Sequence, residues 1–247
     1  MGYEENKIEG RNAVLEAFRS GKTIDKLFVL DGCQDGPIKS ITREARKGDT
    51  IINYVNKERL DQISETGKHQ GVIAISAAYD YAEVEDILEN AKKKGEAPFI
   101  IILDGIEDPH NLGAIIRTAN QAGAHGIIIP KRRAVGLTPT VARTSAGAIN
   151  YTPVAKVTNI TQTIKELKDK GMWFVCADMD GTPMYDLNLT GSIGLVIGNE
   201  GDGVSKLVKE NCDMIATIPM KGDIDSLNAS VATGVLAYEI VRQRLGK

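Results

Sequence analysis

From residue 99 to residue 130 the chain reads FIIILDGIEDPHNLGAIIRTANQAGAHGIIIP. Two apolar runs, at 99–103 and 126–129, enclose a polar segment in which residues 112–122 have helical character. Neither run alternates between polar and apolar residues, which is typical of strands covered on both faces, as in a parallel sheet. A strand, a helix and a second strand in this order predict an α/β fold.

The same alternation continues toward the C-terminus. Further apolar, strand-like runs lie at 173–177, 193–197 and 214–218. Helical segments are expected at 138–145, 161–170, 204–211 and 227–244. Residues 98–247 are therefore expected to form one domain around a mainly parallel sheet.

The residues before this region repeat the alternation on a smaller scale. Strand-like stretches at 26–30, 50–55 and 71–76 alternate with helical stretches at 13–18, 37–47 and 57–64. We predict a small α/β domain over residues 1–78, near the lower end of independent domain size. The polar, charged residues 79–97 are expected to be a linker that contains a short helix at 84–93.

The composition is that of an ordinary globular protein, with 247 residues, 42% of them hydrophobic and 26% charged. No apolar run approaches the ~20 residues of a transmembrane helix, and the N-terminus has no signal-peptide core. Cys33, Cys176 and Cys212 are widely spaced, so we expect reduced thiols and no disulfide framework. The cysteines and histidines share no metal-ligand spacing. These features predict a cytoplasmic protein without a metal.

The charge distribution does not by itself decide whether nucleic acid is a partner. The net charge of −3 argues weakly against it. Phosphates respond to local potential, however, and Lys131, Arg132 and Arg133 form a basic cluster, with Arg143 ten residues further on. A solvated surface explains such a cluster equally well.

Three polar segments follow apolar runs: the segment from residue 103 to 126, LVIGNEGDGVS at 195–205 and IPMKGDIDSLNASVATG at 218–234. In open α/β sheets ligands bind at the carboxyl ends of strands. The three segments are therefore expected to form one composite site. The polar residues that they bring to it are Asn111, Arg117, Glu200, Ser226 and Asn228.

These segments resemble, in order, the signature motifs of the SpoU (TrmH-like) family of RNA ribose 2'-O-methyltransferases in the SPOUT superfamily. The motifs are N-x5-R within DPHNLGAIIRTA, then GNEGDG, then IPM followed by SLNASVA. In the N-terminal part, GRNAVLEAF at 10–18 and HQGVIA at 69–74 resemble the substrate RNA-binding domain of RlmB-like ribosomal RNA guanosine-2'-O-methyltransferases.

The resemblance implies a trefoil knot in the C-terminal domain and a homodimer with the active site near the subunit interface. It implies S-adenosylmethionine as methyl donor, no metal, and the ribose 2'-hydroxyl of RNA as acceptor. Because of the N-terminal α/β domain, a guanosine of 23S ribosomal RNA is favoured over a transfer RNA. Two alternatives stay open: a transfer RNA 2'-O-methyltransferase, and a non-catalytic RNA-binding or ribosome-assembly factor of the same fold.

The resemblance also assigns roles to individual residues. The catalytic set is Asn111, Arg117, Glu200, Ser226 and Asn228. The residues expected to bind the methyl donor are Gly198, Asn199, Gly201, Ile218, Met220, Leu227 and Asn228. The residues expected to contact RNA are Arg11, Asn12, Gln70, His110, Arg132 and Arg143.

Arg117 is the strongest catalytic candidate, because its helix neighbours Ile115 and Ile116 are apolar. A guanidinium stays protonated in proteins, so its use as a general base is costly. We expect it to orient the target ribose through the adjacent phosphate and to lower the pKa of the 2'-hydroxyl. The alternative is a surface ion pair with a carboxylate of the preceding loop, Asp104, Glu107 or Asp108.

The other polar residues each have a catalytic and a structural interpretation. Glu200 is a base candidate, a partner that holds Arg117, or a carboxylate at the N-terminus of the 204–211 helix. Asn111 and Ser226 are also expected to cap the helices that follow them.

A dinucleotide site is the remaining competing hypothesis. Gly198, Gly201 and Gly203 have the spacing GxxGxG, the reverse of the Rossmann fingerprint GxGxxG. The spacing disfavours a nicotinamide enzyme.

Overall fold

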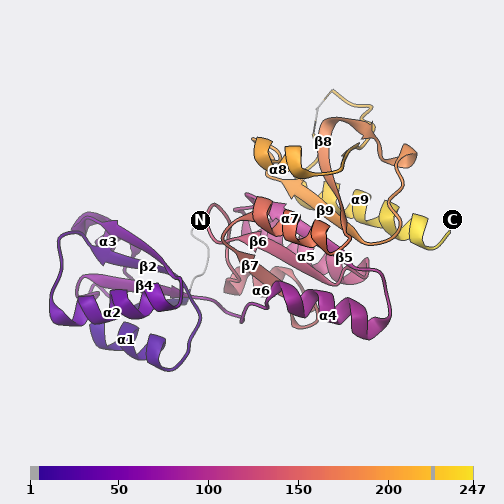
Figure 1. The fold of residues 1–247 in the computed structure, drawn as a ribbon. Helices are drawn as coiled ribbons and strands as arrows, with labels where there is room; N and C mark the ends of the chain where they lie inside the picture. The colour runs from indigo at the N-terminus through magenta and orange to yellow at the C-terminus, as the bar shows by residue number, and fades with distance from the viewer. Residues whose placement is uncertain (1–5, 224–225, 247) are drawn as a thin grey trace. The chain divides into compact units, whose positions relative to one another are not determined.

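The computed structural model describes residues 6–223 and 226–246 (Figure 1). Contacts between residues divide the chain into two compact units. The first contains the residues up to 80 together with 136–140, and the second contains 81–135 and the residues from 141 onward. Among the helices that the structure describes, none is long and apolar enough to cross a membrane.

The first unit is a four-stranded sheet in the order β1-β4-β2-β3. Only β2 and β3 pair in parallel. The strands are β1 (Asn6–Glu9), β2 (Ile24–Leu30), β3 (Ile51–Val55) and β4 (Val72–Ser76). The helices are α1 (Arg11–Arg19), α2 (Gly36–Lys47) and α3 (Lys57–Ile63). This unit is the small α/β fold that the sequence predicts.

Helices cover both faces of this sheet (Figure 1). Val72 and Ala74 of β4 belong to the core under α1 and α2, whereas Ile73 and Ile75 pack with Leu60 of α3. Successive strand residues point to opposite faces. All five residues of β4 are therefore buried, and its sequence is an unbroken apolar run apart from its last residue.

The second unit is built on a six-stranded sheet in the order β10-β8-β9-β5-β6-β7. All neighbouring strands pair in parallel, which confirms the predicted parallel α/β fold. The strands are β5 (Phe99–Asp104), β6 (Gly126–Pro130), β7 (Val154–Val157), β8 (Trp173–Pro183), β9 (Ile193–Gly198) and β10 (Met214–Thr217).

The helices of this part of the chain alternate with the strands. They are α4 (Val84–Lys94), α5 (Pro109–Gln121), α6 (Pro139–Thr144), α7 (Ile160–Asp169), α8 (Lys206–Asn211) and α9 (Ala229–Arg244), with short 3-10 turns at Ala148–Asn150 and Met184–Asp186. Helix α4 packs on the sheet through buried Ile87, whose side chain occupies the space beside Gly126 of β6. The segment expected to be a linker therefore contributes to the core of the second unit.

The strand order positions the polar segments. Strand β5 lies beside β9 in the sheet, and Asp104 and Gly198 are paired at the carboxyl ends of these two strands. The segments that follow β5 and β9 consequently leave the sheet at the same edge. This is the edge at which α/β sheets bind ligands.

Three strands differ from the sequence expectation. Strands β1 and β7 have four residues each and were not expected from the pattern. Strand β8 continues past residue 177 to Pro183, because the exposed residues that follow pair with β10 after an irregularity between Ile215 and Ala216. Because the residues of this extension are mostly exposed, they form no apolar run from which the sequence could predict a strand.

Candidate functional site

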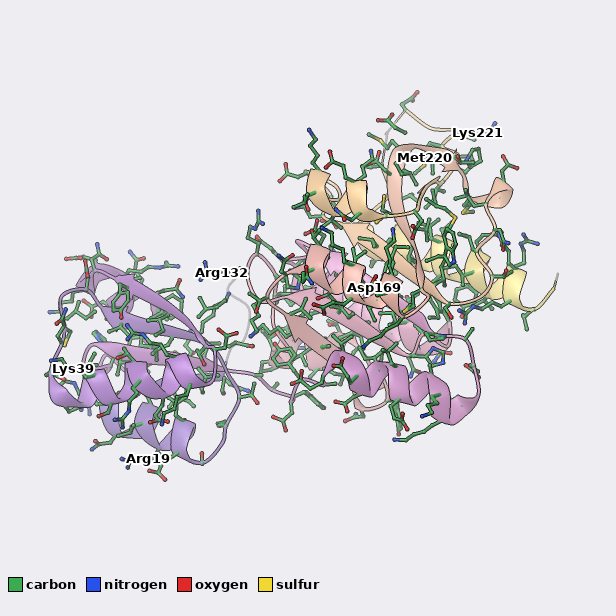
Figure 2. The ribbon with its side chains drawn as sticks, in the orientation of Figure 1. Arg19, Lys39, Arg132, Asp169, Met220 and Lys221 are labelled. Atoms are coloured by element: carbon green, nitrogen blue, oxygen red, sulfur yellow. The ribbon has the colours of Figure 1, made fainter. Side chains whose placement is uncertain are left out.

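A cavity of about 620 Å³ lies at the carboxyl ends of β9 and β10 and beside the middle of β8. Its size is within the range of small-molecule sites. The predicted donor-binding residues that line it are Gly198, Asn199, Gly201, Ile218, Met220 and Leu227. Glu200 and Ser226 of the predicted catalytic set line it as well. Figure 2 shows Met220 beside Lys221 on the loop that follows β10.

The GNEGDG segment is a tight turn that brings the backbone to the cavity wall. The side-chain oxygen of Asn199 accepts hydrogen bonds from the backbone N–H groups of Gly201 (2.9 Å) and Asp202 (2.6 Å). A Cβ at Gly198 would collide with the backbone of Gly203, whose φ of 67° favours glycine. Two of the three glycines are thus explained by the geometry of the turn.

The three predicted motifs meet in one hydrogen-bonded cluster. Oε1 of Glu200 accepts from Nδ2 of Asn111 at 2.6 Å and from Nδ2 of Asn228 at 2.9 Å. The same Nδ2 of Asn228 lies 2.9 Å from Oδ1 of Asn111. The backbone N–H of Ala229 also donates to Oε1 of Glu200, at 3.4 Å. Glu200 therefore lies at the N-terminus of α9, where the helix dipole favours a negative charge, and not at that of α8.

Two predicted helix caps are wrong. Asp108 is the N-cap of α5, with its carboxylate accepting from the backbone N–H of His110, and Asn111 lies inside the first turn, 7% exposed. Asn228 is the N-cap of α9, accepting from the N–H groups of Ser230 and Val231, so Ser226 does not cap it. The side chain of Asn111 is thereby free to reach Glu200.

Arg117 does not join this cluster. Six residues after Asn111, it lies about 120° around the helix from it, and its side chain is exposed. In the described part of the chain Arg117 forms no ion pair with the three carboxylates of the preceding loop. Asp104 instead accepts from the backbone N–H of Ser205 at 2.8 Å. Glu200 holds the two asparagines and not Arg117.

The far side of the cavity carries a charge pair that the sequence analysis missed. Asp178 of β8 lines the cavity and accepts from Nζ of Lys209 at 2.8 Å. Burial by itself would raise the pKa of Asp178, but Lys209 and the backbone N–H of Asp180 outweigh it and lower that pKa. The cavity wall thus holds an ionised carboxylate. No sequence signal marked it, because it lies in the polar extension of β8.

The predicted RNA-binding residues occupy both units. Arg11, Asn12 and Gln70 belong to the first unit, where Nε of Arg11 donates to the carbonyl of Gln70 at 3.1 Å. The side chains of His110, Arg132 and Arg143 are exposed on the second unit. Within residues 6–223 and 226–246, no three His, Cys, Asp or Glu side chains gather to hold a metal ion. All three cysteines are free thiols.

Comparison with known proteins accounts for both units. The model of the SpoU rRNA Methylase family matches residues 98–238. The model described as RNA 2'-O ribose methyltransferase substrate binding matches residues 7–82. The two family models and the named relatives identify the chain as an RNA methyltransferase. The chain belongs to the SpoU rRNA methylase family.

Individual relatives support this assignment. A Bacillus subtilis (strain 168) protein named as a TrmH family tRNA/rRNA methyltransferase, YacO, is 48% identical over 99% of this chain and 98% of its own length. An AdoMet-bound rRNA methyltransferase from Sinorhizobium meliloti is 25% identical, with a TM-score of 0.61 over 97% of this chain and 88% of that one. A TrmH/SpoU tRNA modifying enzyme of A. aeolicus is 28% identical, with a TM-score of 0.56 over 65% of this chain and 85% of that one.

Proposed function

We propose that this chain transfers a methyl group from S-adenosylmethionine to a ribose 2'-hydroxyl of RNA, with a guanosine of 23S ribosomal RNA as the favoured target. The observation that carries the proposal is the Glu200 cluster. One carboxylate oxygen holds Asn111 of the first motif and Asn228 of the third, beside a cavity that Glu200 itself lines.

The cavity suits the methyl donor. Ile197, Ile218 and Leu227 offer apolar walls, and the turn after Gly198 offers backbone polar groups at close approach. These residues would hold the adenosine and the amino-acid tail. When bound, S-adenosylmethionine supplies an electrophilic methyl group on its sulfonium. The AdoMet-bound relative from Sinorhizobium meliloti supports this assignment.

The hydrogen bonds of Glu200 favour a positioning role over that of a base. Its Oε1 already accepts from three donors. A carboxylate so engaged fixes the amides of Asn111 and Asn228, and holding reactants in line accounts for much of the rate of such a transfer.

Arg117 is proposed to serve the active site of a second copy of the chain. It is exposed on α5, and α5 packs against α9 with Thr118 near Gly234. Helix α9 and its C-cap Leu245 present exposed apolar residues seven positions apart, at Val231, Tyr238 and Leu245. Seven-residue spacing places them on one side of the helix. An apolar stripe next to an unpaired arginine suits a homodimer in which each copy contributes Arg117 to its partner.

Ribosomal RNA is favoured over transfer RNA because of the first unit. The Sinorhizobium meliloti rRNA methyltransferase matches 97% of the chain. The A. aeolicus tRNA modifying enzyme matches 65%, so about a third of this chain has no counterpart there.

The test is transfer of labelled methyl from S-adenosylmethionine to total RNA from a strain that lacks this protein. Label at one 2'-O-methylated nucleotide of 23S RNA is the expected result. Label in transfer RNA would refute the ribosomal target but keep the reaction. No label in any RNA, together with no donor binding by calorimetry, would favour the non-catalytic RNA-binding alternative.

A further inference from the structure

A second cavity, of about 360 Å³, lies in the first unit. It is lined by Arg11, Leu30, Cys33, Gln70 and Gly71. These residues come from the start of α1, the end of β2 and the loop after it, and the loop before β4. The two N-terminal sequence motifs, at 10–18 and 69–74, therefore meet at this one place.

The two motifs are joined by a pair of hydrogen bonds. The backbone N–H of Arg11 donates to Oε1 of Gln70 at 3.2 Å, and Nε of Arg11 donates to the carbonyl of Gln70 at 3.1 Å. Gln70 has a φ of 51°, which is uncommon for a residue with a side chain. Such backbone geometry persists where surrounding contacts impose it, and it is concentrated at functional sites.

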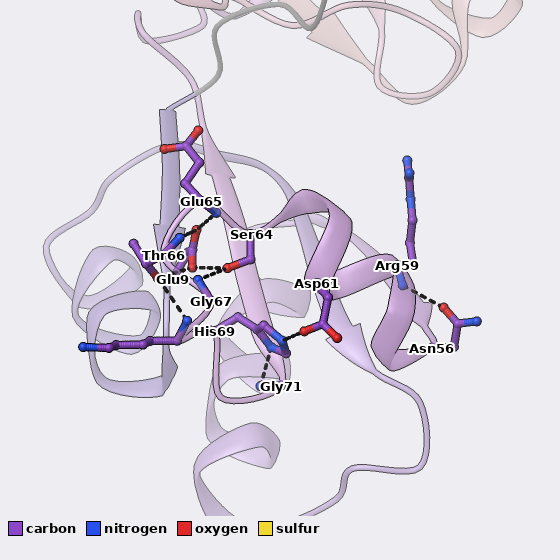
Figure 3. Close-up of polar contacts among 11 residues, drawn as sticks. Glu9, Asn56, Arg59, Asp61, Ser64, Glu65, Thr66, Gly67, His69 and Gly71 are labelled. Carbon is purple, nitrogen blue, oxygen red and sulfur yellow. Dashed lines mark hydrogen bonds and ion pairs between the residues drawn. The ribbon is translucent and has the colours of Figure 1, made fainter.

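The residues before and after Gln70 are held by two sets of hydrogen bonds (Figure 3). The carboxylate of Glu9 accepts from the hydroxyls of Ser64 and Thr66, both at 2.6 Å. The ring of His69 bridges Asp61, at 2.9 Å, and the backbone N–H of Gly71, at 3.0 Å. The cavity is thus preorganised, which lowers the entropy cost of binding a ligand.

The charges in this cavity do not suit a phosphate. Nη2 of Arg11 lies 2.6 Å from Oδ2 of Asp35, so the one cationic group at the cavity is already neutralised. Leu30 supplies an apolar wall, and the thiol of Cys33 accepts from Nη2 of Arg11 at 3.8 Å and donates to Oδ2 of Asp35 at 3.6 Å. The cavity also offers both hydrogen-bond donors and hydrogen-bond acceptors: the guanidinium of Arg11, the carboxylate of Asp35 and the amide of Gln70. This mixture matches the edge of a planar, neutral heterocycle.

We infer that this cavity binds an unstacked nucleobase of the substrate RNA. The base would lie against Leu30 and Cys33, and the amide of Gln70 and the Arg11–Asp35 pair would bind its polar edge. Proteins recognise RNA sequence mainly through such splayed bases. The inference rests on the proposed function, because it identifies the part of the RNA substrate that the first unit recognises.

Cys33 allows a direct test, because its thiol lines the cavity. The full-length protein is treated with iodoacetamide, and alkylation of Cys33 is followed by peptide mass spectrometry, with its rate in the protein alone as the reference. Short single-stranded oligoribonucleotides are expected to bind in the cavity and to slow the alkylation of Cys33. Equal protection by inorganic phosphate or an abasic oligomer overturns the inference, as does no protection by any oligomer. Stronger protection by a free nucleoside than by the oligomer also overturns it.

Gln70→Gly tests the same point by kinetics. Glycine accepts the φ of this position, and the substitution removes the amide. It is expected to raise KM for the methylated RNA about tenfold, the loss of one good hydrogen bond, with unchanged affinity for the methyl donor. Gln34→Gly, at an exposed residue beside Cys33 that does not line the cavity, is the matched control.

Failure of the base-binding inference and failure of the proposed function give different results. Wild-type protein that methylates RNA, with no change of KM in Gln70→Gly, refutes the base-binding cavity and leaves the proposed function standing. Wild-type protein that methylates no RNA refutes the proposed function, whereas the alkylation experiment still reports whether the cavity binds a base.

Discussion

Asn228 donates a hydrogen bond from Nδ2 to Oδ1 of Asn111 at 2.9 Å, although 117 residues separate them in the chain. Both amides also donate to the same oxygen of Glu200. Three segments that follow different strands are therefore fixed to one another by a single carboxylate. Displacement of one of these residues must loosen the other two.

Substitution of Glu200 distinguishes positioning from base catalysis. Glu200→Gln keeps an oxygen that can accept from Asn111 and Asn228, so a small loss of kcat is expected. Glu200→Ala leaves the amide of Asn111 unsatisfied and buried, and a loss on the order of 100-fold is expected from misplacement of the site. Single-turnover methylation with saturating RNA measures both. If the two variants are equally inactive, Glu200 is the base.

Arg117 is expected to act in trans. Arg117→Ala is expected to be inactive alone, and Glu200→Ala is expected to keep on the order of 1% of wild-type activity. When the two are co-expressed, half of the dimers contain one copy of each, and one of their two sites is intact if the arginine crosses the interface. About a quarter of wild-type activity should return. An arginine that serves its own copy leaves the mixture no more active than the two variants alone.

The exposed stripe on α9 gives a test of the dimer itself. Tyr238 is 51% exposed, and Tyr238→Glu places a charge where the proposed interface is apolar. We expect a monomer by sedimentation, with methylation lost. Tyr54→Glu makes the same change at a tyrosine of the first unit that is 52% exposed, and it should leave the assembly unchanged. A Tyr238→Glu variant that sediments like the wild type contradicts the proposed interface.

The sequence predicted the strands well because burial on both faces requires unbroken apolar runs, as in β5 and β9. It missed the second half of β8, where exposed residues are held only by pairing with β10. The motifs identified Glu200 and its two asparagines but not the bonds among them. The six-residue spacing by itself turns Arg117 about 120° around the helix from Asn111, so their separation could have been found from the sequence. Which side of α5 faces Glu200 depends on how the helix packs, and the motif does not give that.

Cap residues show a similar limit. Asp108 precedes Pro109, and proline is favoured in the first turn of a helix, so this N-cap could have been found from the sequence. At α9, Ser226 and Asn228 are both good caps. Only the hydrogen bonds to Ser230 and Val231 identify Asn228.

Two glycines of the GNEGDG turn should respond differently to alanine. A Cβ at Gly198 would collide with the backbone of Gly203, whereas a Cβ at Gly201 would meet only the side-chain oxygen of Asn199, at 3.6 Å. Gly198→Ala is expected to distort the cavity wall, lower Tm and weaken binding of the methyl donor at least about tenfold. Gly201→Ala should keep Tm within a degree or two of wild type, roughly the effect of a tolerated surface change. Calorimetry and thermal unfolding measure both, and equal effects would contradict the packing argument.

The carboxylate of Glu9 should make the stability of the first unit depend on pH in the acidic range. Burial alone would raise its pKa, but hydrogen bonds from Ser64, Thr66 and the backbone of Glu65 and Thr66 lower that pKa from 4.5 to about 2. An unfolded chain therefore binds this proton at a higher pH than the folded one. The stabilisation is fully present above pH 4.5 and is lost as the pH falls toward 2.

Glu9→Gln measures this contribution. The free energy of unfolding of the first unit is measured by urea unfolding, followed through NMR signals of β2 and β4. The difference in this free energy between Glu9→Gln and wild type should be largest above pH 4.5 and should shrink toward pH 2. Titration of the Glu9 carboxyl carbon gives the pKa directly. Glu16→Gln, at an exposed carboxylate of α1, should show no such dependence. A constant difference between Glu9→Gln and wild type across this range would mean that the lost hydrogen-bond geometry, and not the charge, stabilises the loop that carries Gln70.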